Sequence, residues 1–115
     1  MTTAAMSEDG VVVTVDYAES WLVRADEAEE AGDETQAKAA AGMAAALFSQ
    51  LGRRWAGVRA GNSAEHYGRA AAAYRRAGRP GPAKRMAARA DEMRLVQIHA
   101  DLDREVWLAS LEVAS

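Results

Sequence analysis

The sequence predicts an all-α protein of antiparallel helical hairpins, with an extended N-terminal arm and a C-terminal capping helix that covers the last hairpin. Three observations lead to this fold class. Apolar residues recur at helical spacing through most of the 115 residues. Gly32 and Gly78 interrupt this pattern where short turns are expected. The stretch Ser63–Asp91 has a degraded copy 46 residues earlier.

Residues 1–16 are expected to form the arm, and residues 17–115 a single helical domain. Residues 1–10 are small and polar without hydrophobic periodicity, which predicts disorder. Residues 11–15 read VVVTV, a β-branched run that favours an extended strand. Because a lone strand is not stable in water, it must pack on its own domain, pair with a second copy or meet a partner. We favour packing on its own domain.

In the first hairpin, Asp16 is expected to cap a helix that Gly32 ends in the left-handed conformation. Asp33 is expected to cap the second helix. The apolar spacing of that helix continues through Gly52, so it either ends there or reaches about Arg59. We favour the longer helix.

In the second hairpin, Asn62 or Ser63 is expected to cap the first helix, and Pro82 suits the first position of the next one after Gly78. From Ala83 to the end there is no Gly or Pro, which is compatible with one long helix or with two joined near residues 97–99. The C-terminal end has an apolar surplus, which fits a helix that caps the last hairpin or pairs with another subunit. Its residues are Val106, Trp107, Leu108, Leu111 and Val113.

The two copies of the repeat share small and aromatic residues at a constant offset. Ala18, Trp21, Ala25, Ala28, Gly32, Ala37 and Ala44 lie 46 residues before Ala64, Tyr67, Ala71, Tyr74, Gly78, Ala83 and Ala90. This pattern resembles the tetratricopeptide repeat (TPR), which has an aromatic residue and a small one in its first helix, then a turn glycine and two alanines in its second. The spacing of 46 departs from the 34 residues usual in that family, and the closing proline is absent.

The resemblance implies that the first helix of each hairpin lines a concave surface that binds a partner peptide or helix. The implied partner-binding positions are Glu19, Leu22, Asp26, Glu29 and Glu30 in the first copy, and Glu65, Gly68, Ala72, Arg75 and Arg76 in the second. Such a groove would be acidic at one end and basic at the other, with a floor of small residues. Alternatively, the acidic and basic residues simply face each other across adjacent helices.

Charge is strongly segregated along the chain. Residues 1–50 have a net charge of −8, residues 51–90 of +9 and residues 91–115 of −4. The basic block predicts either internal pairing with the acidic segments or binding of an anionic partner. The residues of this possible anionic-partner patch are Arg53, Arg54, Arg59, Arg69, Arg79, Arg85 and Arg89.

No pattern in the sequence indicates catalysis. His66, expected to be exposed, and His99 lack carboxylates at metal-ligand spacing, and the chain contains no cysteine. We therefore expect no catalytic residue, no cofactor and no metal. The expected function is a non-catalytic interaction or regulatory adaptor module that binds another protein. The alternative is a nucleic-acid-binding regulator that uses the Arg-rich segment 53–89.

Further expectations concern assembly and location. Because two repeats are fewer than usually stand alone, a homodimer through the C-terminal helix or the arm is expected. No run of 18 apolar residues and no secretory signal is present, which favours a cytoplasmic protein without membrane contact. Twelve arginines accompany two lysines in an Ala- and Gly-rich chain, which is typical of a high-GC bacterial genome.

Overall fold

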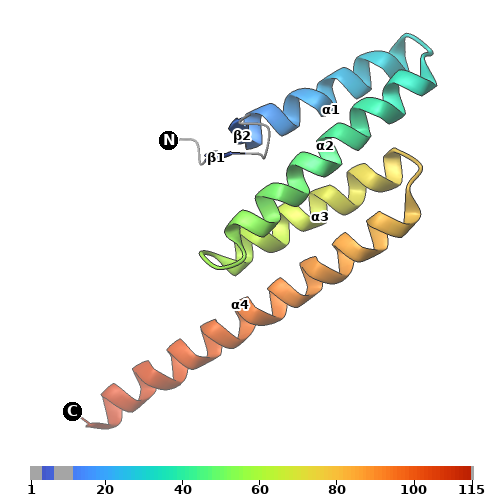
Figure 1. The fold of residues 1–115 in the computed structure, drawn as a ribbon. Coiled ribbons are helices and arrows are strands. Elements are labelled where there is room, and N and C mark those ends of the chain that lie inside the picture. The colour runs from blue at the N-terminus through green and yellow to red at the C-terminus, as the bar shows by residue number, and fades with distance from the viewer. Residues whose placement is uncertain (1–3, 7–11, 115) are drawn as a thin grey trace.

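The computed structural model describes residues 4–6 and 12–114 of the chain. Four helices account for nearly all of them, which confirms the all-α prediction. They are α1 (Val15–Glu30), α2 (Glu34–Trp55), α3 (Ala60–Arg76) and α4 (Pro80–Ala114), preceded by the short strands β1 (Ala4–Met6) and β2 (Val12–Thr14). Consecutive helices run antiparallel and pack as neighbours, α1 on α2, α2 on α3 and α3 on α4 (Figure 1).

The glycine turns of both hairpins are formed as predicted. Gly32 and Gly78 have φ of 76° and 75°, which is the left-handed region that favours glycine. At the first turn the Asp33 N–H donates to the Ala28 carbonyl at 2.8 Å, which closes the end of α1. The Asp33 carboxylate then accepts from the Gln36 N–H at 3.1 Å, which confirms Asp33 as the cap of α2.

Three predicted helix starts are wrong by a few residues. The cap of α1 is Thr14 rather than Asp16, and its hydroxyl oxygen accepts from the Tyr17 N–H at 3.0 Å. Helix α3 begins at Ala60 without a side-chain cap, ahead of the predicted Asn62 or Ser63. Helix α4 begins at Pro80 rather than Pro82, because a proline needs no N–H partner in the first turn and both fit there.

Helix α2 ends between the two predicted limits. It passes through Gly52 and stops at Trp55, short of Arg59. Gly52 is needed for packing rather than for a turn, since a Cβ atom there would lie 2.7 Å from a ring carbon of Tyr67. The Ser63 hydroxyl donates to the Gly52 carbonyl at 2.7 Å and is fully buried. Gly52 is therefore a point of close contact between α2 and α3.

Small residues build the core of the stack. Eight of the repeated alanines are buried, and Phe48 and Leu51 are the largest side chains with no exposed surface. The buried repeat alanines are Ala18, Ala25, Ala37, Ala44, Ala64, Ala71, Ala83 and Ala90. Alanine at a helix contact lets the axes approach closely, so both copies of the repeat pack in the same manner.

The N-terminal arm lies on its own domain, as favoured from the sequence. Strand β2 pairs antiparallel with β1, with Ala4 opposite Thr14 and Met6 opposite Val12. Val13 is fully buried in the core formed by α1, α2 and α3. The sequence did not reveal β1, because AAM carries no strand pattern. The remaining residues of the predicted disordered segment, 1–3 and 7–10, lie outside the described part of the chain.

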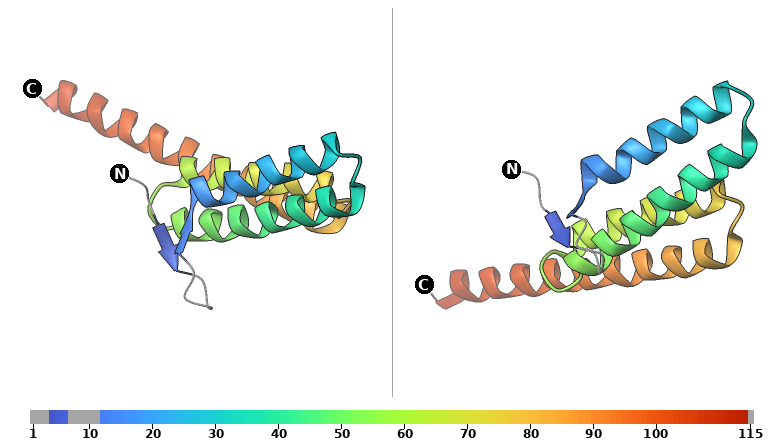
Figure 2. Two further views of the ribbon diagram at one scale, coloured as in Figure 1. Left: turned by 90° about the horizontal axis from the view of Figure 1, so that it is seen from above. Right: turned by 45° about the horizontal axis from the view of Figure 1, so that its top comes forward.

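Helix α4 is one continuous helix of 35 residues, and only its first half packs on the body. Ala83 and Ala90 are buried against α3, whereas every described residue from 98 to 113 is exposed. Both views of Figure 2 show the second half extending alone past the α2–α3 turn. The predicted C-terminal capping helix therefore does not fold back over the last hairpin, because no Gly or Pro breaks α4 after its first turn.

Candidate interaction surfaces

The face shared by α1 and α3 is closed by ion pairs between the two helices. Glu19 pairs with Arg69 at 3.0 Å, and Glu29 pairs with Arg76 at 3.0 Å. Arg76 also donates to Asp26, and the hydrogen bonds to Glu29 and Asp26 raise the pKa of its guanidinium above the ordinary value. Of the predicted groove positions, Asp26 and Glu29 thus pair with Arg76, whereas Glu30 and Arg75 form no such pair with any described residue, so the alternative interpretation of the sequence holds for part of the surface.

The remaining predicted groove positions do not form a continuous floor. Leu22 is half-buried and packs on the core. Gly68 is half-buried, and a Cβ atom there would lie 3.6 Å from the Arg94 guanidinium of α4. The other four positions are exposed, namely Glu30, Glu65, Ala72 and Arg75. These four positions are accessible to a partner, whereas the other six predicted groove positions take part in packing or in ion pairs.

The opposite face, formed by α2 and α4 over α3, is basic and aromatic. A shallow hollow there has Arg53 and Arg89 at its rim and Tyr67 and Tyr74 among its lining residues. The Arg89 guanidinium lies 5.8 Å from the centre of the Tyr67 ring, and Arg79 lies 5.7 Å from that of Tyr74. Both arginines thus contact a tyrosine ring while remaining exposed, and Arg89 also lines the hollow.

The predicted anionic-partner patch is divided by the fold. Arg69 belongs to the α1/α3 face, where it pairs with Glu19 and lies 4.4 Å from the centre of the Phe48 ring. The other six residues are exposed and form no ion pair with any described residue. They are Arg53 and Arg54 at the end of α2, Arg59 in the α2–α3 turn, Arg79 in the α3–α4 turn, and Arg85 and Arg89 in the first half of α4.

His66 belongs to the core, and its predicted exposure is wrong. It is only 8% exposed and stacks on Phe48 with the ring centres 6.3 Å apart. Burial lowers the pKa of the imidazole, and Arg69 lowers it further, although Glu65 opposes both effects. His66 follows Ser63 and Ala64 on the buried side of α3, although a histidine close to a helix start is ordinarily expected to be exposed.

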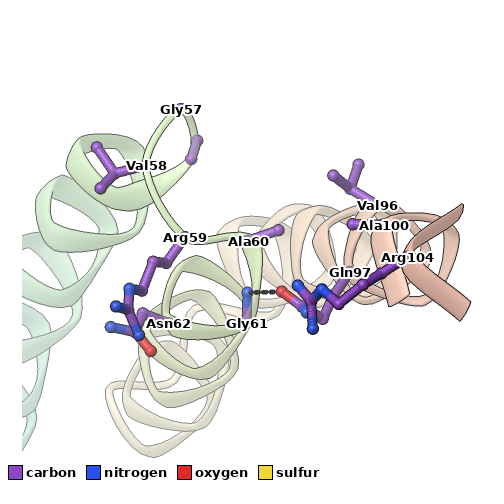
Figure 3. Close-up of a pocket in the computed structure, with 11 residues that line it drawn as sticks. Gly57, Val58, Arg59, Ala60, Gly61, Asn62, Val96, Gln97, Ala100 and Arg104 are labelled. Carbon is purple, nitrogen blue, oxygen red and sulfur yellow. Dashed lines mark hydrogen bonds between the residues drawn. The ribbon is translucent and has the colours of Figure 1, made fainter. Parts of the chain in front are cut away.

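A hollow at the end of the stack was not predicted. It lies between the α2–α3 turn, including Val58 and Arg59, and the residues Val96, Ala100 and Arg104 of α4. Figure 3 shows the turn and the helix on two sides of this hollow, bridged where the Gly61 N–H donates to the Gln97 side-chain oxygen at 3.2 Å. We call this hollow the inner corner. Its two charged side chains are both arginines.

The C-terminal half of α4 carries the largest exposed apolar surface of the described chain. Its large apolar side chains are 48–88% exposed, and all but Leu108 lie on two faces of the helix. The outer face consists of Leu95, Ile98, Leu102, Val106 and Val113, and the inner face of Val96, Ala100, Trp107 and Leu111. The sequence showed this apolar surplus, but only the extension of α4 beyond the body shows that it is uncovered.

Comparison with known proteins adds no family to this description. No protein-family model, curated protein or solved structure matches the chain. The resemblance to the tetratricopeptide repeat thus stays a prediction, which rests on the repeated residues. Among the described helices, none combines the length and the apolar character needed to cross a bilayer.

Proposed function

We propose that this protein is a non-catalytic interaction module, of the adaptor or regulatory kind, which binds a helix of another protein on the outer face of α4. The observation that carries the proposal is the exposure of this face: Leu95, Leu102 and Val106 are 56%, 51% and 66% exposed. Contiguous apolar surface of this kind is typical of protein-binding sites. A straight stripe on one helix is matched by the apolar stripe of an amphipathic helix.

The outer face changes character where α4 leaves the body. At the same helical positions, the first half of α4 carries Lys84, Ala88 and Asp91, which are exposed and mostly charged. From Leu95 onward the face is apolar. The change supports a contact confined to the second half of α4, since the first half presents an ordinary solvated surface.

Charge beside the outer face supports a particular kind of partner. Asp101 and Glu105 are exposed and follow Ile98 by three and seven residues, so they flank the apolar stripe. A partner helix with Lys or Arg beside its own apolar stripe would complement Glu105 directly, whereas Asp101 already accepts from Gln97 at 2.9 Å and pairs with Arg104 at 3.7 Å. The α1/α3 face is a weaker candidate, because a ligand there would compete with the ion pairs of Arg69 and Arg76.

Site-specific photo-crosslinking in the native cell tests the proposal. A photoreactive amino acid replaces Leu102 in one variant and Val23 of α1 in the control, because the two side chains are 51% and 54% exposed. We expect one identified protein to crosslink at position 102, with the attachment point in an amphipathic helix, and not at position 23. Val106→Glu should abolish that product. Equal crosslinking at both positions would refute the proposal.

A second candidate function is binding of an anionic polymer such as nucleic acid on the α2/α4 face. It is supported by Arg53 and Arg89 flanking the tyrosines of the hollow without an ion pair to any described residue. Phosphate contacts through arginine weaken steeply with salt. Anisotropy of a labelled 20-nucleotide strand should then show binding that falls between 50 and 200 mM salt. Arg53→Glu with Arg89→Glu should abolish it, whereas Arg24→Glu on α1 should not.

A further inference from the structure

We infer that the inner corner is the docking site for a second copy of this chain, whose α4 enters it antiparallel to the first. The contact uses the inner face of α4 (Val96, Ala100, Trp107 and Leu111), which is distinct from the outer face proposed for the partner helix. A helix that is apolar on two sides has room for two neighbours. Without any neighbour, this half of α4 would be an isolated helix of marginal stability.

The spacing of the inner face is symmetric. Its four residues follow one another at intervals of four, seven and four, which read the same in both directions. A two-fold antiparallel contact therefore places Val96 of each copy opposite Leu111 of the other. The same contact places the small Ala100 opposite the Trp107 ring, which is 60% exposed in the single chain. Large residues thus meet small or medium ones along the whole contact.

The inner corner supplies a concave surface at the matching level. In the antiparallel contact, residues 104–111 of the second copy lie beside residues 96–103 of the first. That level is where the α2–α3 turn forms the other wall of the hollow, with the Val58 side chain pointing away from α4 (Figure 3). On the α4 side of the hollow, Val96 and Ala100 offer an apolar surface to the tip of the second helix.

Charge complementarity selects the antiparallel direction. The segment 95–113 has a net charge of −3, whereas residues 53–62 at the corner contain three arginines and no acid. An antiparallel contact brings each acidic tip to the basic corner of the other copy. A parallel contact would instead join acidic tip to acidic tip and basic corner to basic corner, which is unfavourable.

Sedimentation equilibrium of the purified full chain, from 1 to 100 µM, tests the inference. We expect a dimer. Trp107→Glu with Leu111→Glu should raise the dimer dissociation constant at least about 100-fold, since central aromatic anchors dominate interfaces. The matched control is Leu102→Glu with Val106→Glu, which alters the outer face alone and should leave the dimer intact. Circular dichroism checks that both variants keep their helix content.

Disulfide trapping tests the direction, on a cysteine-free background. Proteins with Val96→Cys and with Leu111→Cys should crosslink when mixed and not when oxidised separately, because like positions lie about 22 Å apart in the antiparallel contact. Crosslinking of either protein alone would show a parallel contact and overturn the inference. So would a monomer at every concentration, or a dimer unaffected by the inner-face substitutions. None of these outcomes would change the photo-crosslinking at position 102. The dimer could therefore be refuted while the proposed function still holds.

Discussion

The two halves of α4 differ in what surrounds them, although they form one helix without a break. The first half presents Ala83 and Ala90 to α3 and is held by that contact. The second half carries larger apolar residues, such as Leu102 and Trp107, and leaves them about half exposed or more. The more hydrophobic half is thus the one that the folded chain does not bury.

The difference in burial lies in the neighbours of the two halves rather than in their hydrophobicity, because α3 lies beside the first half and no described helix covers the second. The repeated alanines allow neighbouring helices to pack closely, and Gly52 allows the Tyr67 ring to lie directly on α2. Large side chains on α4 beyond the last turn meet no helix of the same chain. Stability of the monomer should therefore depend on the body, and assembly on the second half of α4.

The largest test compares one side chain from each region. Phe48→Ala removes a fully buried ring and should lower the free energy of unfolding by about 3–5 kcal/mol. Leu102→Ala removes a side chain that is half exposed, so the free energy of unfolding should change by less than about 0.5 kcal/mol. Urea unfolding at low micromolar concentration measures both. Similar losses for the two variants would mean that α4 beyond residue 95 is part of the folding core.

A smaller effect tests close approach within the body. Gly52→Ala would place a Cβ atom 2.7 Å from the buried Tyr67 ring, and the overpacking should cost about 1–3 kcal/mol. The matched control is Gly42→Ala in the same helix, where the new Cβ atom would lie 3.9 Å from the Ala77 Cβ. It should stabilise by up to about 1 kcal/mol, because alanine is the better helix former. Thermal unfolding should shift in opposite directions, and a stabilised Gly52→Ala variant would contradict the packing described.

The smallest effect is the pH dependence from His66. Its pKa in the folded state is lowered from 6.5, mainly by burial, so the unfolded chain binds a proton more readily. The contribution is complete above pH 6.5, and stability falls as the pH drops from there toward the folded-state pKa. Urea unfolding from pH 5 to 8 should show this slope, and His66→Gln should lose it. If the His66→Gln variant kept the same slope of unfolding free energy against pH, other groups would be responsible for the pH dependence.

Much of the body follows from sequence patterns that act locally. Gly32 and Gly78 reach positive φ without strain, so the turns of both hairpins were predictable. The Asp33 carboxylate accepts from a free N–H group at the start of α2, so this cap was predictable as well. The buried repeat alanines followed from periodicity. The cap Thr14 and the helix starts at Ala60 and Pro80 were missed because several neighbouring residues are suitable places for a helix to begin.

The candidate surfaces were predicted less completely, because they depend on how helices face one another. The sequence predicts that Glu29 and Arg76 lie on the first helices of adjacent hairpins. Only the fold shows that these two side chains form an ion pair at 3.0 Å. The inner corner joins residues 56–62 to residues 96–104, which no local pattern connects. His66 is buried because its ring stacks on Phe48 of α2, a contact between residues distant in the chain.

The sequence by itself determined the helical class and the two hairpins, because periodicity and glycine turns act over a few residues, whereas it left open whether α4 is one helix or two. Only the tertiary structure decided which charges pair, where β1 lies and that α4 runs past the body instead of covering it. These outcomes depend on contacts between residues far apart in the chain. Their energies are set by distance and burial, which the order of residues does not specify.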